Sequence, residues 1–182
     1  MKRSLSIIVA IDQENGIGKG GVLPWNIPGD MKHFKNITTL VSEEGKMNAV
    51  IMGRKTWDSI PEVFRPLKNR INVVLTRNKS LQFEEGVIVS SGLKDALKAI
   101  EEQYSEKLDK IFVIGGQQVF NAAINDASCN NLFVTHINKI FDCDVFFPEF
   151  QGNFALKSKS ETINEGGNTY CFCEYQRIFK QS

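Results

Sequence analysis

The chain has no excess of charge of either sign, and this absence limits the partners it could bind. Its 182 residues include 22 Lys and Arg against 21 Asp and Glu, so the formal net charge is +1. Binding to nucleic acid or to a lipid surface depends on an excess of clustered cations. We therefore expect neither nucleic acid nor a membrane as a partner.

Histidine and cysteine are also scarce. The two histidines, His33 and His136, are too few and too separated to suggest a metal site, so we expect no bound metal. The four cysteines are Cys129, Cys143, Cys171 and Cys173. Their spacing matches no zinc or redox motif, and the alternation of a strand places Cys171 and Cys173 on one face. We interpret all four as reduced packing residues, which is typical of a cytoplasmic protein.

Long apolar runs are missing as well. No segment approaches the roughly 20 residues that a membrane-spanning helix needs. Met1-Lys2-Arg3 and the apolar run Leu5–Ile11 faintly resemble a signal peptide, but the run ends at Asp12 without a small-residue cleavage site, which favours a first β-strand. The sequence contains no repeat, linker or low-complexity segment, so we expect a single domain over residues 1–182. We also expect a monomer, although no feature of the sequence determines the oligomeric state.

The composition, with 42% hydrophobic residues, supplies enough apolar material for a full core. Apolar runs predict strands at Ser4–Ile11, Asn48–Met52, Ile71–Leu75, Val87–Ser90, Lys110–Ile114, Leu132–Ile137, Ala155–Thr162 and Tyr170–Phe179. Helical patterns predict helices at Asp30–Thr39, Thr56–Ile60, Leu93–Tyr104 and Gln117–Ile124. Short strands that alternate with helices indicate an α/β protein with a mostly parallel central sheet and helices on both faces. The last two strands should add an antiparallel C-terminal edge.

One glycine-rich segment, Gly16-Ile17-Gly18-Lys19-Gly20-Gly21, formally matches the G-x-G-x-x-G dinucleotide-binding motif. That motif must open a helix, and Val22-Leu23-Pro24-Trp25 cannot continue as one. We interpret the segment as a flexible loop that lies close to a ligand and then moves. A plain surface turn is an equal alternative on this pattern alone.

Two other glycine positions are better candidates for phosphate binding. Gly53 and Gly115-Gly116 each connect a predicted strand to a predicted helix, so each offers free backbone N–H groups to an anion. Arg54 and Lys55 add positive charge at the first position. The segment Leu75–Lys79 ends another strand with a hydroxyl and two cations, which with Arg54 could hold the extra ribose phosphate of NADPH. A solvated basic loop is the alternative.

Asp30 is the single carboxylate in the uncharged stretch Leu23–Met31, one helical turn before Phe34. A lone buried carboxylate is costly unless it is hydrogen-bonded, and a flat ligand with two adjacent N–H donors suits it. Taken alone, Asp30 fits a helix-capping role better, since Pro28 marks a helix start; the other motifs favour the ligand. Arg70 could clamp a ligand carboxylate with its planar fork, or lie exposed at a strand start.

Together these motifs closely resemble the dihydrofolate reductase family. The matching segments are Ile8-Val9-Ala10, Asn15-Gly16-Ile17-Gly18, Leu23-Pro24-Trp25 with Asp30 and Phe34, Val50–Trp57, Arg65-Pro66-Leu67 with Arg70, Ile114-Gly115-Gly116, Thr135-His136-Ile137, and Asp144 with Phe146-Phe147-Pro148. The resemblance runs from about Ser4 to Phe179. The insertion Ser42–Lys46 is similar to eukaryotic members, either monofunctional ones or a domain excised from a fusion with thymidylate synthase.

The resemblance implies NADPH-dependent reduction of 7,8-dihydrofolate to tetrahydrofolate, with antifolate-type inhibitors as further ligands. It implies a catalytic group of Asp30, Leu23, Trp25 and Thr135, in which Thr135 supports Asp30 directly or through water. The implied substrate contacts are Ile8, Val9, Ala10, Asp30, Met31, Phe34, Lys35, Ile60, Leu67, Arg70, Ile114 and Thr135. The implied cofactor contacts are Ala10, Gly16, Ile17, Gly18, Gly21, Val22, Gly53, Arg54, Lys55, Thr56, Leu75, Thr76, Arg77, Asn78, Ile114, Gly115, Gly116, Gln117, Gln118, Val119 and Phe120.

Further implications concern the mechanism. Hydride would go to pterin C6, and water would reach N5 past Leu23 while Asp30 stabilises the positive charge on the ring. The Gly115-Gly116 bond should be cis. Three departures from the family, Phe120 for tyrosine, Val145 for threonine and Ser91 for arginine, remove possible cofactor contacts. The alternatives are a pterin or pyrimidine reductase on the same fold and a non-catalytic folate- or nucleotide-binding protein.

Overall fold

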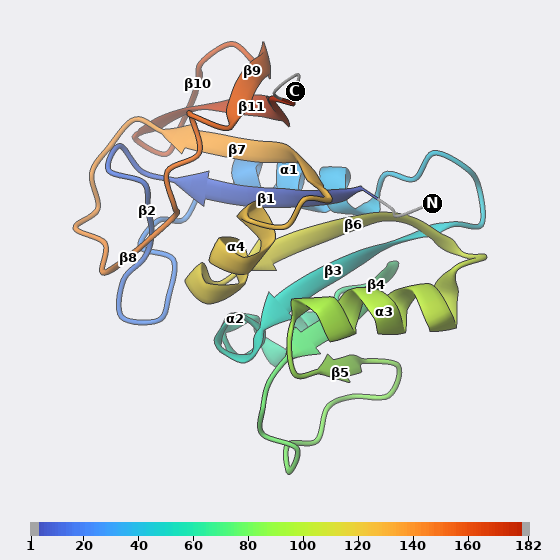
Figure 1. The fold of residues 1–182 in the computed structure, drawn as a ribbon. Helices are drawn as coiled ribbons and strands as arrows, with labels where there is room; N and C mark the ends of the chain where they lie inside the picture. The colour runs from blue at the N-terminus through green and yellow to red at the C-terminus, as the bar shows by residue number, and fades with distance from the viewer. Residues whose placement is uncertain (1–3, 180–182) are drawn as a thin grey trace.

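Parallel strands form the centre of the molecule (Figure 1), for which a computed structural model describes residues 4–179. The strands are β1 (Leu5–Ile11), β2 (Gly16–Gly18), β3 (Met47–Gly53), β4 (Arg70–Leu75), β5 (Ile88–Ser90), β6 (Leu108–Gly115), β7 (Cys129–Ile137), β8 (Val145–Phe146), β9 (Phe154–Lys159), β10 (Ile163–Glu165) and β11 (Asn168–Arg177). The helices are α1 (Pro28–Thr39), α2 (Arg54–Ser59), the 3-10 turn η1 (Glu62–Phe64), α3 (Leu93–Tyr104) and α4 (Gln117–Ile124). Met1-Lys2-Arg3, and the outermost ends of the domain predicted over 1–182, lie outside the described residues.

The main sheet has the order β10-β11-β7-β1-β6-β3-β4-β5, with β9 also paired to β11. All neighbouring pairs from β7 through β1, β6, β3 and β4 to β5 are parallel, whereas β11 is antiparallel to β7. The prediction of a mostly parallel sheet with an antiparallel C-terminal edge is therefore confirmed.

Helices cover both faces of the sheet because the central strands bury side chains on both sides. In β1, Leu5, Ile7 and Ile11 pack into one core and Ile8 into another, as strand alternation requires. The first core includes residues of α3 and α4, and the second is completed by Trp57 of α2 and residues of α1. Figure 1 shows α3 and α4 in front of the sheet and α1 behind it.

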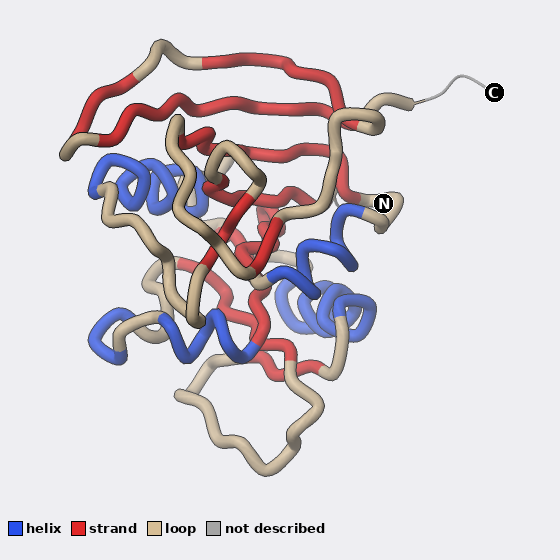
Figure 2. The backbone as a smooth tube through the Cα atoms, turned by 90° about the vertical axis from the view of Figure 1, so that its left-hand side faces the viewer, coloured by secondary structure: helices blue, strands red, loops and turns tan. Residues whose placement is uncertain are grey.

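Several predicted boundaries differ from the structure by one to three residues, and two of the differences have a clear physical reason. Helix α2 begins at Arg54 rather than Thr56, because the chain turns into the helix directly after Gly53. The predicted strand Ala155–Thr162 ends at Lys159 as β9, and a further strand that was not predicted, β10, follows from Ile163; both pair with β11. At the break, the amide of Phe172 donates to the Ser160 hydroxyl at 2.9 Å, so a side chain replaces a ladder bond. Figure 2 shows the break as a short loop in the outermost strand.

The glycine-rich segment is also more ordered than predicted, because Gly16–Gly18 forms β2 and pairs with β8. The buried carboxylate of Asp12 accepts from the amides of Gly16 at 2.7 Å and Phe141 at 3.0 Å, which ties the two segments together. A Cβ at Gly16 would collide with Cys143 and Asp12, so this glycine is required for close approach. Gly20 and Gly21, both with positive φ and exposed, form the tight turn between Lys19 and Val22, whose backbones exchange hydrogen bonds of 2.9 and 3.2 Å.

The four cysteines are all free thiols. The sulfur atoms of Cys171 and Cys173 lie 4.0 Å apart, which confirms that both side chains are on one face of β11. Within residues 4–179, no helix is long and apolar enough to cross a membrane, and no cluster of His, Cys, Asp and Glu has the arrangement of a metal site.

Candidate active site

The parallel strands bring the predicted site residues to one edge of the sheet. Register places Gly53 beside Leu75 across β3 and β4, and Met52 beside Gly115 across β3 and β6. On the other side of the centre, Ala10 of β1 pairs with Thr135 of β7. Because these strands run the same way, their carboxyl ends form a common rim, where ligands of open α/β sheets usually bind.

Asp30 is one of the few buried charged groups, and it is held by Thr135. The Thr135 hydroxyl donates to Oδ1 of Asp30 at 2.6 Å, and both side chains are buried. Asp30 lies in the first turn of helix α1, where an acid is favourable, and its carboxylate is in addition held by a hydroxyl from another strand. Burial raises the pKa of the Asp30 carboxyl, the hydrogen bond from Thr135 opposes this rise, and the charge of Glu165 adds to it.

Glu165 and Tyr170 form a second polar layer that sequence reasoning missed. Oε2 of Glu165 accepts from the amide of Gly29 at 2.9 Å and from the Tyr170 hydroxyl at 3.0 Å. Burial, then the hydrogen bond and charge of Glu165, raises the pKa of Tyr170 to about 12. A Cβ at Gly29 would collide with both side chains. Glu165 thus anchors the start of α1, yet an acid beside a glycine turn gives no sequence signal of that role.

Trp25 lies beside this cluster with a buried indole. Its ring packs edge-on against Phe141 at 5.2 Å, in a small core with Ile27 and Tyr170. Within the described residues, the buried indole N–H of Trp25 has no acceptor. A buried donor without a protein partner is rare and suits a water or ligand oxygen. Leu23, two residues earlier, is exposed.

Arg70 is fixed in place by two hydrogen bonds. Its Nη1 donates to the Thr38 hydroxyl at 2.9 Å and its Nε to the Lys68 carbonyl at 3.0 Å, while the guanidinium lies 6.0 Å from the centre of the Phe34 ring. Neither bond uses Nη2. Burial lowers the pKa of Arg70, which still remains charged at any physiological pH. The fork is therefore oriented before any ligand arrives.

Two buried residues that the sequence did not single out support Arg70. Thr38, fully buried in α1, donates a hydrogen bond from its hydroxyl to the Phe34 carbonyl at 2.7 Å. Asn72 in β4 accepts from the Leu67 amide at 2.9 Å and donates to the Leu67 and Arg70 carbonyls at 2.9 Å. A polar residue inside an apolar strand was the available signal for Asn72.

The two glycine junctions meet at the centre of the rim. A Cβ at Gly53 would lie 3.7 Å from the Gly116 amide nitrogen, and one at Gly115 would lie 3.2 Å from the Thr56 hydroxyl. Gly115 has a φ of 131°, and its peptide bond to Gly116 is cis, as the resemblance predicted. The bare backbones of β3 and β6 thus lie beside the first turns of α2 and α4, whose leading N–H groups have no partner within the helix.

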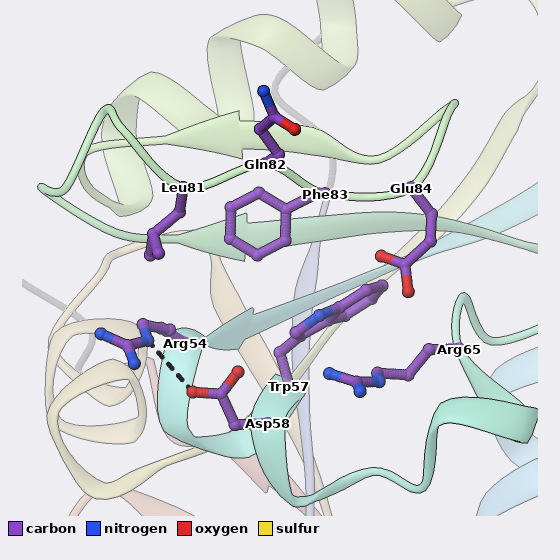
Figure 3. Close-up of a pocket in the computed structure, with 8 residues that line it drawn as sticks. All are labelled: Arg54, Trp57, Asp58, Arg65, Leu81, Gln82, Phe83 and Glu84. Carbon is purple, nitrogen blue, oxygen red and sulfur yellow. Dashed lines mark hydrogen bonds and ion pairs between the residues drawn. The ribbon is translucent and has the colours of Figure 1, made fainter.

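Two further groups of predicted cofactor residues lie along the rim. Val119 and Phe120 are buried in the main core, yet their side chains border the rim. A Cβ at Gly53 would lie 3.3 Å from Cγ2 of Val119, and one at Gly115 would lie 3.6 Å from the Phe120 ring. Arg54 and Arg77 are exposed further along it, near Thr76, whose hydroxyl accepts from the Asn78 amide at 3.1 Å. Arg54 also lines a pocket of roughly 430 Å³ between α2 and residues 81–84, which is separate from the Asp30 cluster (Figure 3).

The loop residues between β2 and α1 are held from the far side by Asp144. Its carboxylate accepts from the Gly20 amide at 2.8 Å, and its own amide donates to the Gly18 carbonyl at 3.0 Å. Ile17 is buried under this connection, whereas Gly21 and Val22 are exposed. The segment from Gly16 to Gly20 is thus held against β8 and the residue before it.

The fold and these strand-end groups define a single-domain α/β protein whose polar residues gather at the carboxyl rim of a parallel sheet. A family model described as dihydrofolate reductase matches residues 4–177, and the chain therefore belongs to the dihydrofolate reductase family.

Known relatives agree with this assignment. The chain is 48% identical to dihydrofolate reductase of Rattus norvegicus, covering 97% of this chain and 99% of the relative. It is 40% identical to bifunctional dihydrofolate reductase-thymidylate synthase 1 of Arabidopsis thaliana, and here it spans about a third (35%) of the relative's length. The solved structure of Schistosoma mansoni dihydrofolate reductase matches with a TM-score of 0.87 at 37% identity, covering 98% of this chain and 100% of that one.

Proposed function

We propose that the chain catalyses the NADPH-dependent reduction of 7,8-dihydrofolate to 5,6,7,8-tetrahydrofolate, a step of one-carbon metabolism. The observation that carries this proposal is the buried Asp30–Thr135 pair at the rim, in a chain of this family. A carboxylate that is already held on one oxygen offers its remaining lone pairs to two adjacent N–H groups of a flat heterocycle. Dihydrofolate and antifolate-type inhibitors carry such groups on the pterin or its analogue.

Asp30 would stabilise the positive charge that the pterin acquires when N5 is protonated. Burial raises the pKa of the free carboxyl, and a bound cationic ring would lower it again, because opposite charges favour each other's ionised form. Water would supply the N5 proton past the exposed side chain of Leu23. The buried N–H of Trp25, which has no acceptor among the described residues, suits a bound water on that route.

Met31, Phe34, Ile60 and Leu67 would pack against the aminobenzoyl ring, and Arg70 would pair with the glutamate α-carboxylate. The support for this arrangement is the fixed plane of the Arg70 fork, since planar bidentate pairing loses less entropy when the arginine is preorganised. Lys35, exposed one turn beyond Met31, would add positive charge near the same ligand end.

The residues at the glycine junctions fit NADPH. Close backbone approach at Gly53 and Gly115-Gly116, beside two helix starts, suits a diphosphate that accepts from backbone N–H groups. When bound, NADPH supplies the hydride for pterin C6. Arg54 and Arg77 would read its ribose phosphate, and Ala10 and Ile17 would line the nicotinamide end. The β2 loop would exclude bulk water from that end while Asp144 holds it closed.

The direct test is the fall in NADPH absorbance after adding dihydrofolate, with NADH in a parallel reaction. We expect rapid turnover with NADPH and little with NADH. Absence of turnover with either cofactor in folded protein, together with tight binding of both ligands, would favour a non-catalytic folate-binding protein. Turnover of a pterin without a glutamate tail, in preference to dihydrofolate, would instead indicate a relative with another substrate.

A further inference from the structure

Arg54, the arginine proposed to read the cofactor's ribose phosphate, already has an anionic partner in the chain. Its Nε donates to Oδ2 of Asp58 at 3.0 Å, one helical turn further along α2 (Figure 3). Both side chains are about half exposed, at 52% and 49%. An exposed pair of this spacing contributes little to stability, so its consequence has to be sought at the site rather than in the fold.

We infer that Asp58 is a specificity-determining residue that limits the preference of this chain for a 2′-phosphorylated cofactor; this inference rests on the proposed function. By accepting from Nε, Asp58 leaves the two terminal nitrogens of Arg54 for a phosphate. It also keeps a negative charge beside the place where the phosphate would sit. The dianionic phosphate and the carboxylate would therefore share one guanidinium, and the repulsion between their like charges would weaken phosphate binding.

The arrangement of the rim supports a local effect. Gly53 and Leu75 are register partners, so Arg54 and the segment that starts with Thr76 follow neighbouring strand ends. Ser90 is the register partner of Leu75 on the other side, and the following residue, Ser91, donates its hydroxyl to Asp95 at 2.6 Å. A carboxylate thus follows β3 (Asp58) and another follows β5 (Asp95), on either side of the basic segment that follows β4. Of the two carboxylates, Asp58 contacts an arginine directly.

The test separates charge from geometry with Asp58→Asn. The asparagine side-chain oxygen still accepts from Nε of Arg54, so the orientation of the guanidinium is kept while the negative charge is lost. The probes are adenosine 2′,5′-bisphosphate and adenosine 5′-monophosphate, whose dissociation constants are measured by calorimetry at low salt. The same pair of measurements is made with NADPH and NADH by fluorescence.

We expect Asp58→Asn to bind the bisphosphate and NADPH about three- to tenfold more tightly, with the monophosphate and NADH unchanged within twofold. The gain should shrink as salt is raised toward 0.5 M, because exposed charges are screened. The control is Glu102→Gln, which removes the acid of a similar exposed ion pair, with Lys98 on α3 at 3.7 Å. This control should leave the affinities for all four ligands unchanged. Thermal melting checks that both variants fold.

Arg54→Gln distinguishes the possible failures. If Arg54→Gln loses the preference for the bisphosphate but Asp58→Asn leaves it unchanged, the role of Asp58 is overturned and the proposed function stands. If Asp58→Asn weakens bisphosphate binding, Asp58 orients Arg54 rather than competing with the phosphate, and the inference is wrong. If Arg54→Gln has no effect on the preference, Arg54 does not read the phosphate, and that part of the proposed function fails with the inference.

Discussion

The two ends of the rim are built in opposite ways. At the Asp30 end, the charged group is buried, held by Thr135 from a neighbouring strand and backed by Glu165. At the Arg54 end, the charged groups are exposed, and among the described residues the arginine is held by Asp58 from its own helix alone. A buried, preorganised charge interacts strongly and is weakly screened, whereas an exposed one is screened and exchanges partners easily. The first end is suited to chemistry and the second to tuning affinity.

The largest expected effect comes from removing the buried charge. Asp30→Asn should lower kcat/KM for dihydrofolate by about 10²- to 10³-fold at neutral pH, since the pterin cation loses its counter-charge. The loss should be partly reversed at low pH, where the substrate is already protonated. Steady-state kinetics from pH 5 to pH 8 measure this. If the variant keeps the wild-type kcat/KM across that range, Asp30 takes no part in the mechanism, and the proposed contrast between the two ends of the rim is wrong.

Arg70 tests whether preorganisation also matters at the edge of the substrate end. Arg70→Leu should weaken dihydrofolate binding by about 10- to 100-fold, the loss expected for one bidentate charge-assisted pair. Dihydropteroate, which lacks the glutamate, serves as the control ligand and should bind both proteins alike. Equal dissociation constants for dihydrofolate in the variant and the wild type would mean that Arg70 is structural and serves only Thr38 and the chain around Lys68.

The sequence predicted the parallel strands well because short Val- and Ile-rich runs have few alternatives between helices. It also placed Asp30 and Thr135 in one site, but only through the family resemblance, since nothing local in the chain connects residues 105 positions apart. Glu165 could not be predicted, because its role depends on β10 folding back along β11 to reach the amide of Gly29. Long-range contacts of that kind are set by topology rather than by local pattern.

The broken C-terminal edge shows the same limit. A continuous strand Ala155–Thr162 follows from alternation, yet Ser160 bonds the Phe172 amide with its side chain and interrupts the ladder. Hydroxyl side chains can replace backbone hydrogen-bond partners in this way, and the pattern of apolar and polar residues does not reveal where this happens. The ion pair of Arg54 with Asp58 was missed for a related reason: the helix was predicted to begin at Thr56, which leaves Arg54 outside the i, i+4 spacing that α2 provides.

Glu165 offers a smaller effect that sharpens the comparison, because it acts on Asp30 without contacting the pterin. Glu165→Gln keeps an oxygen for the Gly29 amide and the Tyr170 hydroxyl but removes a negative charge that raises the pKa of Asp30. We expect the acid limb of the kcat/KM profile to move to lower pH while the maximum changes less than about threefold. The control is Glu174→Gln, whose carboxylate pairs with Lys157 at 2.8 Å on the sheet edge. If the acid limb moves equally in both variants, the shift comes from the change in net charge and not from the position of Glu165 beside Asp30.

The smallest expected effect concerns stability at the buried end. Burial raises the pKa of Asp30 above its unfolded value, so the native state binds the proton more tightly and loses stability as pH rises through that raised pKa. Asp30→Asn, which still accepts from Thr135, avoids the cost of a buried charge and should melt about 3 °C higher at pH 7, corresponding to about 1 kcal/mol. As the pH falls toward about 4 the gap should narrow, because the wild-type carboxyl becomes increasingly neutral in both states. The matched change at the exposed end, Asp58→Asn, should alter the melting temperature by less than about 1 °C at either pH.

Melting curves of the three proteins at pH 4 and pH 7 measure both differences. A lower melting temperature of Asp30→Asn at pH 7 would show that the ionised carboxylate stabilises the fold.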